Sequence, residues 1–297
     1  MKTSYLALGA AMLAAASPAL ATPNDATSED TTADTSSSDD PQRTIIVTGT
    51  ATAEQAETVI ERTPGGVDII SDEDFKDTPV QHIEDILRYA PCVVTQRRMG
   101  DDARISIRGS GLSRAYGVRG IAVLLDGIPM NTSDGLMDFF EIDPSAYRYV
   151  EVYRGSNALR YGANALGGAI NLVTPTGRDA SAFEGRVDVG SFGYVKGQAS
   201  TGGVSGDLDY FVTASAQTID GYRDHSEGDA FRANGSLGYR FSEKAATRFY
   251  VTAASTDQRI PGEVSKPSAL NDPRAANPVW VLQDQQRNVD SIRISNK

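Results

Sequence analysis

Four arginines cluster in two polar, glycine-rich stretches of the chain, residues 96–103 and 109–120. They are Arg97, Arg98, Arg114 and Arg119. A guanidinium group presents a planar fork of N–H donors that holds a carboxylate through two hydrogen bonds at once. Arginines gathered in loops therefore predict the capture of an anionic ligand, and these four are the candidate ligand-binding residues. They could equally pair with Asp101 and Asp102, or with acids on another part of the fold.

The chain offers little for covalent or metal-dependent catalysis. Cys92 is the only cysteine, so there is no disulfide framework and no cysteine-based metal site. The two histidines, His82 and His225, lie far apart in the sequence and do not suggest a metal-binding triad. No Ser/His/Asp order can be argued either. We therefore expect no catalytic residues, no bound metal, no cofactor and no enzyme activity.

A longer stretch, residues 149–174, begins as a strand, crosses four glycines and ends as a second strand. Glycine at this density indicates backbone that turns sharply or lies close against another surface. A nucleotide-binding loop needs Gly-Lys-Ser/Thr ending on a helix, or Gly-x-Gly-x-x-Gly directly after a strand. Neither spacing occurs here. The stretch is therefore expected to be structural.

The first residues predict export. A lysine at position 2, an apolar run over residues 6–16 and a small-residue end at Ala21 are typical of a secretory signal peptide, residues 1–21. The apolar run is shorter than the ~20 residues of a membrane-spanning helix.

Residues 22–50 are expected to be a disordered tail. Residues 22–42 hold six acids and no aromatic or basic side chain, so they cannot bury enough apolar surface to fold. These acids supply over half of the net charge of −11. An acidic net charge argues against a nucleic-acid partner, which requires a basic surface. The β-prone peptide of residues 43–49 is either the first strand of the next domain or a free segment suited to adding to a partner's sheet.

The next region, residues 51–175, predicts a small α/β domain. Strands are expected at residues 67–70, 92–95, 104–108 and 121–125. Thr78 and Pro79 predict the N-cap and first position of a helix that Pro91 stops. The unbroken apolar run at 121–125 is typical of a covered central strand.

Motifs in this region resemble the plug domain of TonB-dependent outer-membrane receptors, and in particular that of the ferric-citrate-receptor branch. They occur in the family's order, and Ser156 stands where the family usually has proline. The residues that match are Arg108, Gly109, Asp126, Gly127, Arg154, Gly155, Tyr161, Gly162, Gly167, Gly168 and Asn171.

The resemblance implies further roles. It makes Thr44, Ile45, Ile46, Val47 and Thr48 a TonB box, the peptide that such receptors present to the periplasmic energy-coupling protein TonB. It also implies that residues 96–103, 109–120 and 130–138 form the outward-facing apex of the plug, where the ligand binds. The alternative is that these residues form ordinary solvated loops.

Residues 183–297 alternate apolar and polar side chains in segments of ~10 residues, typical of a membrane β-barrel. A soluble β-sandwich would show the same alternation. After the first hairpin, however, tight connections on one side alternate with extended connections on the other, which is the asymmetry of outer-membrane barrels. We therefore expect an α/β plug domain followed by the first strands of an antiparallel transmembrane β-barrel in outer-membrane lipid.

The segment is long enough for five strands and the start of a sixth, whereas plugged transporters use about 22. An open edge would leave backbone groups unsatisfied in lipid. We therefore expect the sequence to be the N-terminal part of a longer, monomeric receptor, either a truncated gene or a fragment.

The expected function is uptake of a scarce ligand across the outer membrane, and a ferric siderophore or other iron chelate is the first expectation. Cobalamin, a saccharide or another metal complex stay open. A transcription-signalling transducer would need a folded domain ahead of the TonB box, for which residues 22–42 are too short. A secreted β-rich binding or adhesion protein is the third alternative.

Overall fold

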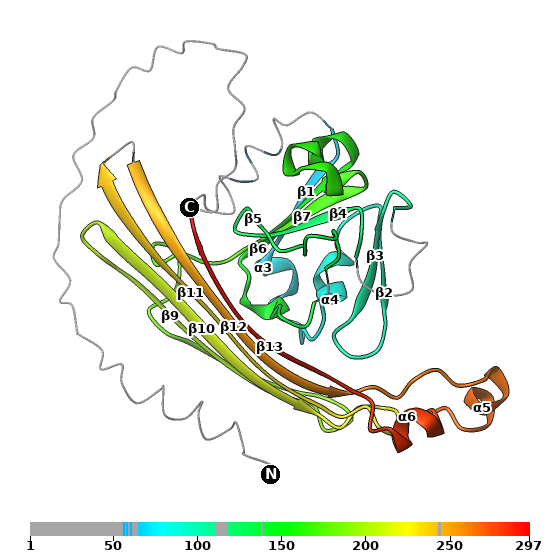
Figure 1. Cartoon of the computed structure of the whole chain (residues 1–297). Coiled ribbons are helices and arrows are strands. Elements are labelled where there is room, and N and C mark those ends of the chain that lie inside the picture. Colours follow the sequence, from blue (N-terminus) through cyan, green and yellow to red (C-terminus); the bar gives the residue numbers. More distant parts are fainter. Residues whose placement is uncertain are drawn as a thin grey trace. The chain divides into compact units, whose positions relative to one another are not determined.

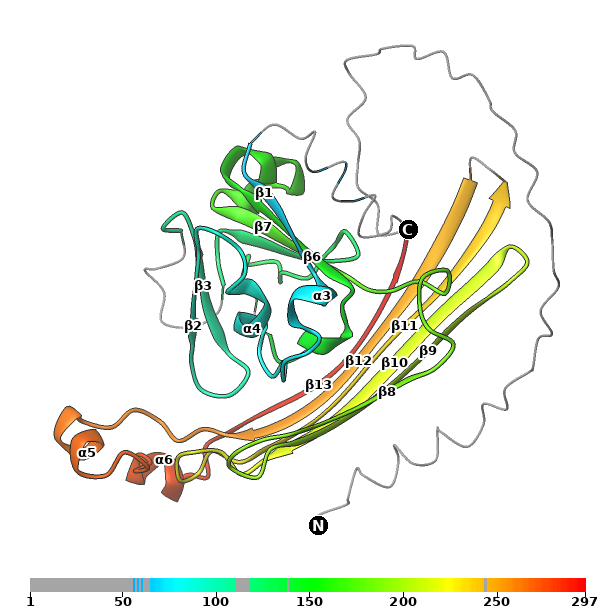
Figure 2. The same ribbon diagram turned by 180° about the vertical axis from the view of Figure 1, so that it is seen from behind.

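A computed structural model describes residues 65–110, 118–137, 139–242 and 245–297, together with residues 56, 58 and 60. The predicted signal peptide and tail, residues 1–50, lie outside this described part, as does Arg114. The described residues belong to one compact unit, in which an α/β domain contacts a long antiparallel sheet (Figure 1). The view from behind shows the α/β domain on the concave side of that sheet (Figure 2).

The α/β domain is built on a five-stranded sheet in the order β1-β6-β7-β4-β5. Its strands are β1 Val67–Ser71, β4 Ile121–Leu125, β5 Ile128–Pro129, β6 Tyr149–Arg154 and β7 Gly168–Val173. β4 runs parallel to β7, and the other neighbours are antiparallel. Every residue of β4 is buried, which confirms the covered central strand predicted from its apolar run.

A separate hairpin joins β2 Val93–Arg97 to β3 Ala103–Ile107. The residues between them, 98–102, form its tip. The hairpin packs its apolar side chains into the same core as α4 Ile83–Leu87, so the tip has a fixed base.

The helix predicted to begin at Thr78 begins one turn later. Thr78 Oγ1 donates to the carbonyl of Phe75 at 2.9 Å and ends the short helix α3 (Asp72–Phe75) instead of capping a new one. The carboxylate of Asp85 accepts from the backbone N–H of His82 at 3.0 Å. That bond satisfies a free N–H at the helix start, so α4 begins after His82.

The two glycine-containing turns of the sheet explain part of the motif. Asp126 and Gly127 join β4 to β5 with φ of 52° and 81°, and a two-residue turn with positive φ at both positions favours glycine. Gly127 also donates its N–H to the Asn171 side chain at 2.8 Å. A side chain at Gly168 would meet the Tyr153 carbonyl and Ile107, so only glycine allows this close approach.

The remaining motif residues lie at one end of the same sheet. Short 3-10 turns, η3 Gly155–Tyr161 and η4 Ala163–Ala165, connect β6 to β7. Arg154 forms an ion pair with Asp68 of β1 at 2.6 Å, and the Arg108 guanidinium lies beside Gly155. The Tyr161 ring packs edge-on against Tyr153 at 5.2 Å. Gly109, Gly162 and Gly167 lie in the connections at this end.

The second sheet holds six strands, paired antiparallel in sequence order. They are β8 Glu184–Val189, β9 Val195–Ser205, β10 Leu208–Ile219, β11 Gly228–Ser242, β12 Ala245–Arg259 and β13 Gln286–Asn296. The predicted alternation is confirmed, because polar side chains such as Lys196 and Arg232 are buried against the α/β domain while Val187, Val212 and Ile294 are exposed on the other face. We call the buried face the inner wall.

The connections confirm the predicted asymmetry. β9 and β10 are joined by residues 206–207, whereas residues 220–227 and 260–285 connect strands at the opposite end. The longest connection carries α5 Lys266–Asn271 and α6 Pro278–Leu282. Among the helices in the described ranges, none is long and apolar enough to cross a bilayer.

Candidate ligand-binding site

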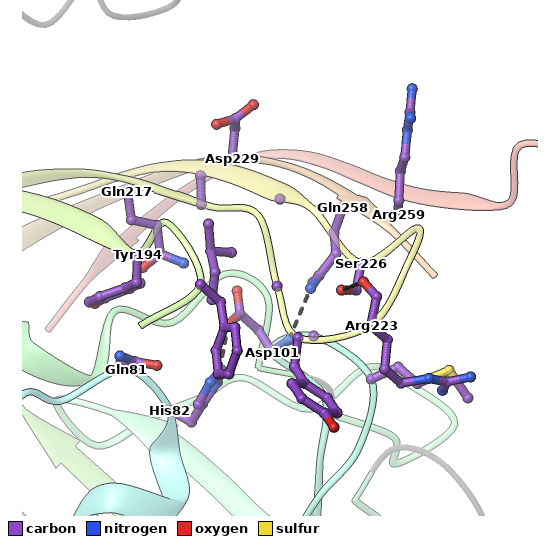
Figure 3. A pocket seen from close by; sticks show the side chains of 18 of the residues that line it. Gln81, His82, Asp101, Tyr194, Gln217, Arg223, Ser226, Asp229, Gln258 and Arg259 are labelled. Atoms are coloured by element: carbon purple, nitrogen blue, oxygen red, sulfur yellow. Dashed lines mark hydrogen bonds and ion pairs between the residues drawn. The ribbon is translucent and has the colours of Figure 1, made fainter. Parts of the chain in front are cut away.

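A cavity of about 500 Å³ opens between the tip of the β2–β3 hairpin and the end of the long sheet that carries the longer connections (Figure 3). Its lining comes from five segments that are far apart in the sequence, within residues 81–82, 97–101, 191–194, 217–230 and 256–261. The cavity therefore exists only because the α/β domain and the inner wall meet.

Two of the four predicted arginines lie at this cavity. Arg97 and Arg98 both line it from the hairpin. Within the described residues, neither guanidinium has an ion-pair partner. Arg119 is exposed and does not line the cavity, and Arg114 falls outside the described part of the chain. The structure thus brings together half of the predicted set, and the roles of Arg114 and Arg119 stay predictions.

The barrel side contributes a cation that the sequence did not single out. Arg223, after β10, donates from Nε and Nη2 to the carbonyl of Ala275 at 3.1 and 2.7 Å and has no acid partner in the described ranges. Two lining acids, Asp229 and Asp257, are exposed neighbours on the outer face of β11 and β12. Figure 3 shows Asp229 pointing away from the cavity. The cavity therefore has a net positive lining.

The third lining acid, Asp101, holds the hairpin tip to the inner wall. Its carboxylate pairs with Arg232 of β11 and lies 3.3 Å from His82 Nδ1, and its N–H donates to the Gln258 side chain at 3.3 Å. Burial alone would raise the pKa of Asp101, but the charge of Arg232 and the contact with His82 outweigh it and lower the pKa to about 2. Asp101 is therefore ionised at neutral pH, and Arg232 compensates its negative charge. We call these four residues the tip clamp.

Several polar groups around the cavity lack hydrogen-bond partners. Three buried atoms have no hydrogen-bond partner in the described part of the chain: the Tyr194 hydroxyl oxygen, Gln217 Oε1 and His82 Nε2. Figure 3 labels these side chains along the lining. Buried polar atoms are nearly always satisfied, so such a group at a cavity indicates that solvent or a polar ligand completes it.

A second set of contacts, made by residues 139–145, holds the α/β domain to another part of the inner wall. Lys196 Nζ lies 2.5 Å from Asp143 Oδ1, and both side chains are almost fully buried. Asp143 also accepts from Ser215, and the Phe140 carbonyl accepts from Arg232 Nε at 2.9 Å. Burial would raise the pKa of Asp143, but Lys196 and Arg232 outweigh it and hold the pKa below its usual range. We call residues 139–145 the anchor segment.

No trio of His, Cys, Asp and Glu side chains within the described ranges gathers closely enough to hold a metal ion. The lining offers guanidinium groups, hydroxyls, amides and aromatic rings. That set can bind an anionic, polar molecule.

Comparison with known proteins identifies the α/β domain. The family described as "TonB-dependent Receptor Plug Domain" matches residues 59–169. The chain carries the plug domain of the TonB-dependent receptors. The α/β domain is therefore the plug, the long sheet resembles the first strands of the barrel of these receptors, and the family places the chain at the outer membrane.

Curated relatives agree with this assignment. The vitamin B12 transporter BtuB of Vibrio cholerae is 27% identical over 211 residues, which is 67% of this chain and 33% of the relative. A hemin receptor of Yersinia enterocolitica is 41% identical over 66 residues, 22% of this chain and 10% of the relative. The chain thus spans about a third of the length of the B12 transporter it matches.

Solved structures share the fold. The ferric citrate transporter FecA in its unliganded form superposes with a TM-score of 0.62 at 21% identity, covering 74% of this chain and 35% of that one. The siderophore receptor PirA of Acinetobacter baumannii gives a TM-score of 0.54 at 21% identity, covering 83% and 39%. At this identity the likeness concerns the fold.

Most of the lining was missed from the sequence, although part of the signal was present. The alternating pattern of the sequence breaks at residues 190–193 and 219–229, which are therefore connections, and antiparallel pairing requires both to lie at the same end of the sheet. Their aromatic and basic residues Phe192, Tyr222 and Arg223 could have been added to the candidate set on that ground.

Proposed function

We propose that the protein takes up a scarce anionic ligand, first of all a ferric siderophore or another iron chelate, across the outer membrane in a TonB-dependent manner. The single observation that carries this proposal is the positively lined cavity between plug and inner wall, with Arg97 and Arg98 free of acid partners among the described residues. A chelate carrying carboxylate or other anionic oxygens would complete those guanidinium groups.

The coupling step is assigned to the N-terminal segment. In this proposal residues 1–21 are removed on export, residues 22–50 form the tail, and Thr44–Thr48 adds as an edge strand to TonB. Backbone hydrogen bonds would provide most of the affinity, and the β-branched side chains suit an extended conformation. Energy delivered through that strand would move the plug, residues 51–175, away from the inner wall formed by residues 183–297.

A second candidate keeps the transport but changes the ligand. A curated relative is named a vitamin B12 transporter, and it aligns over 67% of this chain, so a cobalamin or another non-iron ligand is the alternative. The positive lining favours the anionic chelate, because Arg97 and Arg98, without acid partners among the described residues, can hold its oxygens through charge-assisted hydrogen bonds.

The test uses uptake and binding together in cells that produce the whole receptor. Ile46→Pro removes a backbone donor and should abolish energised uptake of a radiolabelled ferric chelate while binding at the cell surface persists. Thr35→Pro, in the acidic tail, is the matched control and should leave both unchanged. Normal uptake by the Ile46→Pro receptor would rule out this strand as the coupling segment, and absence of binding by any ferric chelate would overturn the ligand assignment.

A further inference from the structure

Two aromatic rings stand at the rim of the cavity. Phe192 and Tyr222 both line it, and their rings meet edge to face with centroids 5.2 Å apart. They come from different connections, between β8 and β9 and between β10 and β11. Both rings remain about half exposed, at 50% and 46%, so neither is a core residue.

The turn between β8 and β9 positions Phe192. Its φ is 60°, in the left-handed region that a non-glycine residue seldom adopts. Its carbonyl accepts from the N–H of Asp220 and Gly221, at 2.9 and 3.2 Å, and these bonds join the two connections. The next residue, Gly193, has φ of 70°, and the N–H of Tyr194 donates to the Ser191 carbonyl at 3.4 Å, so the positive φ of Phe192 belongs to the tight turn between β8 and β9. This turn and its bonds to Asp220 and Gly221 hold the half-exposed ring at the cavity.

The polar side of the same cavity complements these rings. Arg97, Arg98 and Arg223 supply guanidinium groups for anionic oxygens, and the Tyr194 hydroxyl has no hydrogen-bond partner among the described residues although only 2% of the residue is exposed. An aliphatic polycarboxylate would bind to the guanidinium groups and leave the two aromatic rings in contact with water. A ligand whose anionic oxygens are attached directly to aryl rings would use both, because aromatic rings stack edge to face and guanidinium groups lie over ring faces.

We infer that the ligand is an aryl-bearing ferric chelate, in which catecholate or phenolate oxygens hold the iron, and that Phe192 and Tyr222 form its aryl subsite. This inference rests on the proposed function and narrows its substrate class. It sets the ligand apart from citrate, although the fold is similar to that of a ferric citrate transporter.

The test measures equilibrium binding of radioiron chelates to outer membranes that contain the whole receptor, without energy. The two probes are the ferric complex of 2,3-dihydroxybenzoate and ferric citrate. The wild type should prefer the aryl chelate, and Phe192→Leu with Tyr222→Leu should weaken its binding at least about tenfold while ferric citrate changes less than about twofold. Phe183→Leu, another exposed ring that does not line the cavity, is the control and should change neither.

A second variant separates this inference from the function beneath it. Arg97→Gln with Arg98→Gln should weaken both anionic chelates and reduce the salt dependence of binding. Equal wild-type affinity for the two chelates, or an unchanged aryl-chelate affinity in the double leucine variant, would overturn the aryl subsite and leave ferric-chelate uptake standing. Failure of the wild type to bind either probe would overturn both.

Discussion

Replacing Asp101 by asparagine should loosen the hairpin tip without disturbing the rest of the plug. Asparagine has the shape of the protonated acid and keeps the backbone N–H that reaches Gln258. It removes only the charge that faces Arg232, whose side chain is 2% exposed. The substitution therefore isolates the electrostatic part of the tip clamp.

The size of the effect follows from the pKa of Asp101, which falls from 3.8 to about 2 on folding. That difference of about 1.8 corresponds to about 2 kcal/mol of stabilisation by the ionised form. Because the folded pKa is depressed, this contribution is present above pH ~4 and is lost as the pH falls through about 2. At neutral pH Asp101→Asn should therefore cost about 2 kcal/mol.

Amide hydrogen exchange of residues 98–102 in the whole receptor measures this cost, because a loss of about 2 kcal/mol in local opening accelerates exchange about 30-fold. Asp77→Asn is the control, since Asp77 is an exposed plug aspartate with no ion-pair partner among the described residues. Exchange in Asp101→Asn that stays within about threefold of the wild type would show that Arg232 is satisfied without Asp101 and would refute the tip clamp.

Two more substitutions test buried charges of the plug. Lys196→Met should leave the buried, ionised Asp143 without its ion-pair partner, which should cost about 3–5 kcal/mol in urea unfolding of the plug at pH 7. Acidification should recover part of this loss, because it protonates Asp143. An unchanged unfolding midpoint would contradict the buried pair. Burial raises the pKa of Asp126 from 3.8 to about 7, although Thr174 donates hydrogen bonds to its carboxylate. The folded plug therefore holds a proton that the unfolded chain has lost, and the free energy of unfolding should fall by up to about 4 kcal/mol as the pH rises from ~4 through ~7. Asp126→Asn should remove this slope from a series of urea titrations, and a slope equal to that of the wild type would assign the pH dependence to another group.

Local patterns predicted the elements well. Alternation along β9 to β12 and the apolar run of β4 depend on neighbouring residues only, so they can be read from short windows of sequence. The start of α4 was wrong because two signals competed. Thr78 and Pro79 are a good N-cap pair, but the side chain of Asp85, which follows, satisfies the N–H of His82 and moves the start by a turn.

The cavity could be predicted only in part because it depends on docking. Sequence indicated that Arg97 and Arg98 could pair with Asp101, yet the partner of Asp101 is Arg232, which is 131 residues away. No local pattern specifies which wall residue meets the hairpin tip. Arg97 and Arg98 can therefore bind a ligand in part because Arg232 of the inner wall already compensates the charge of Asp101.

The anchor segment has a consequence for recombining plugs and barrels between receptors. Its contacts reach Lys196 of β9, Ser215 of β10, Arg232 of β11 and Arg293 of β13, which lies 3.0 Å from Glu141. A foreign plug that lacked the two acids Asp143 and Glu141 would leave Lys196 buried without a counter-charge and Arg293 without its ion-pair partner. A foreign barrel without these basic residues would leave Asp143 and Glu141 unpaired in the same way. Domain exchange should succeed only when the wall positions are transplanted together with the plug, so the two parts are expected to diverge in evolution as paired sets of charges.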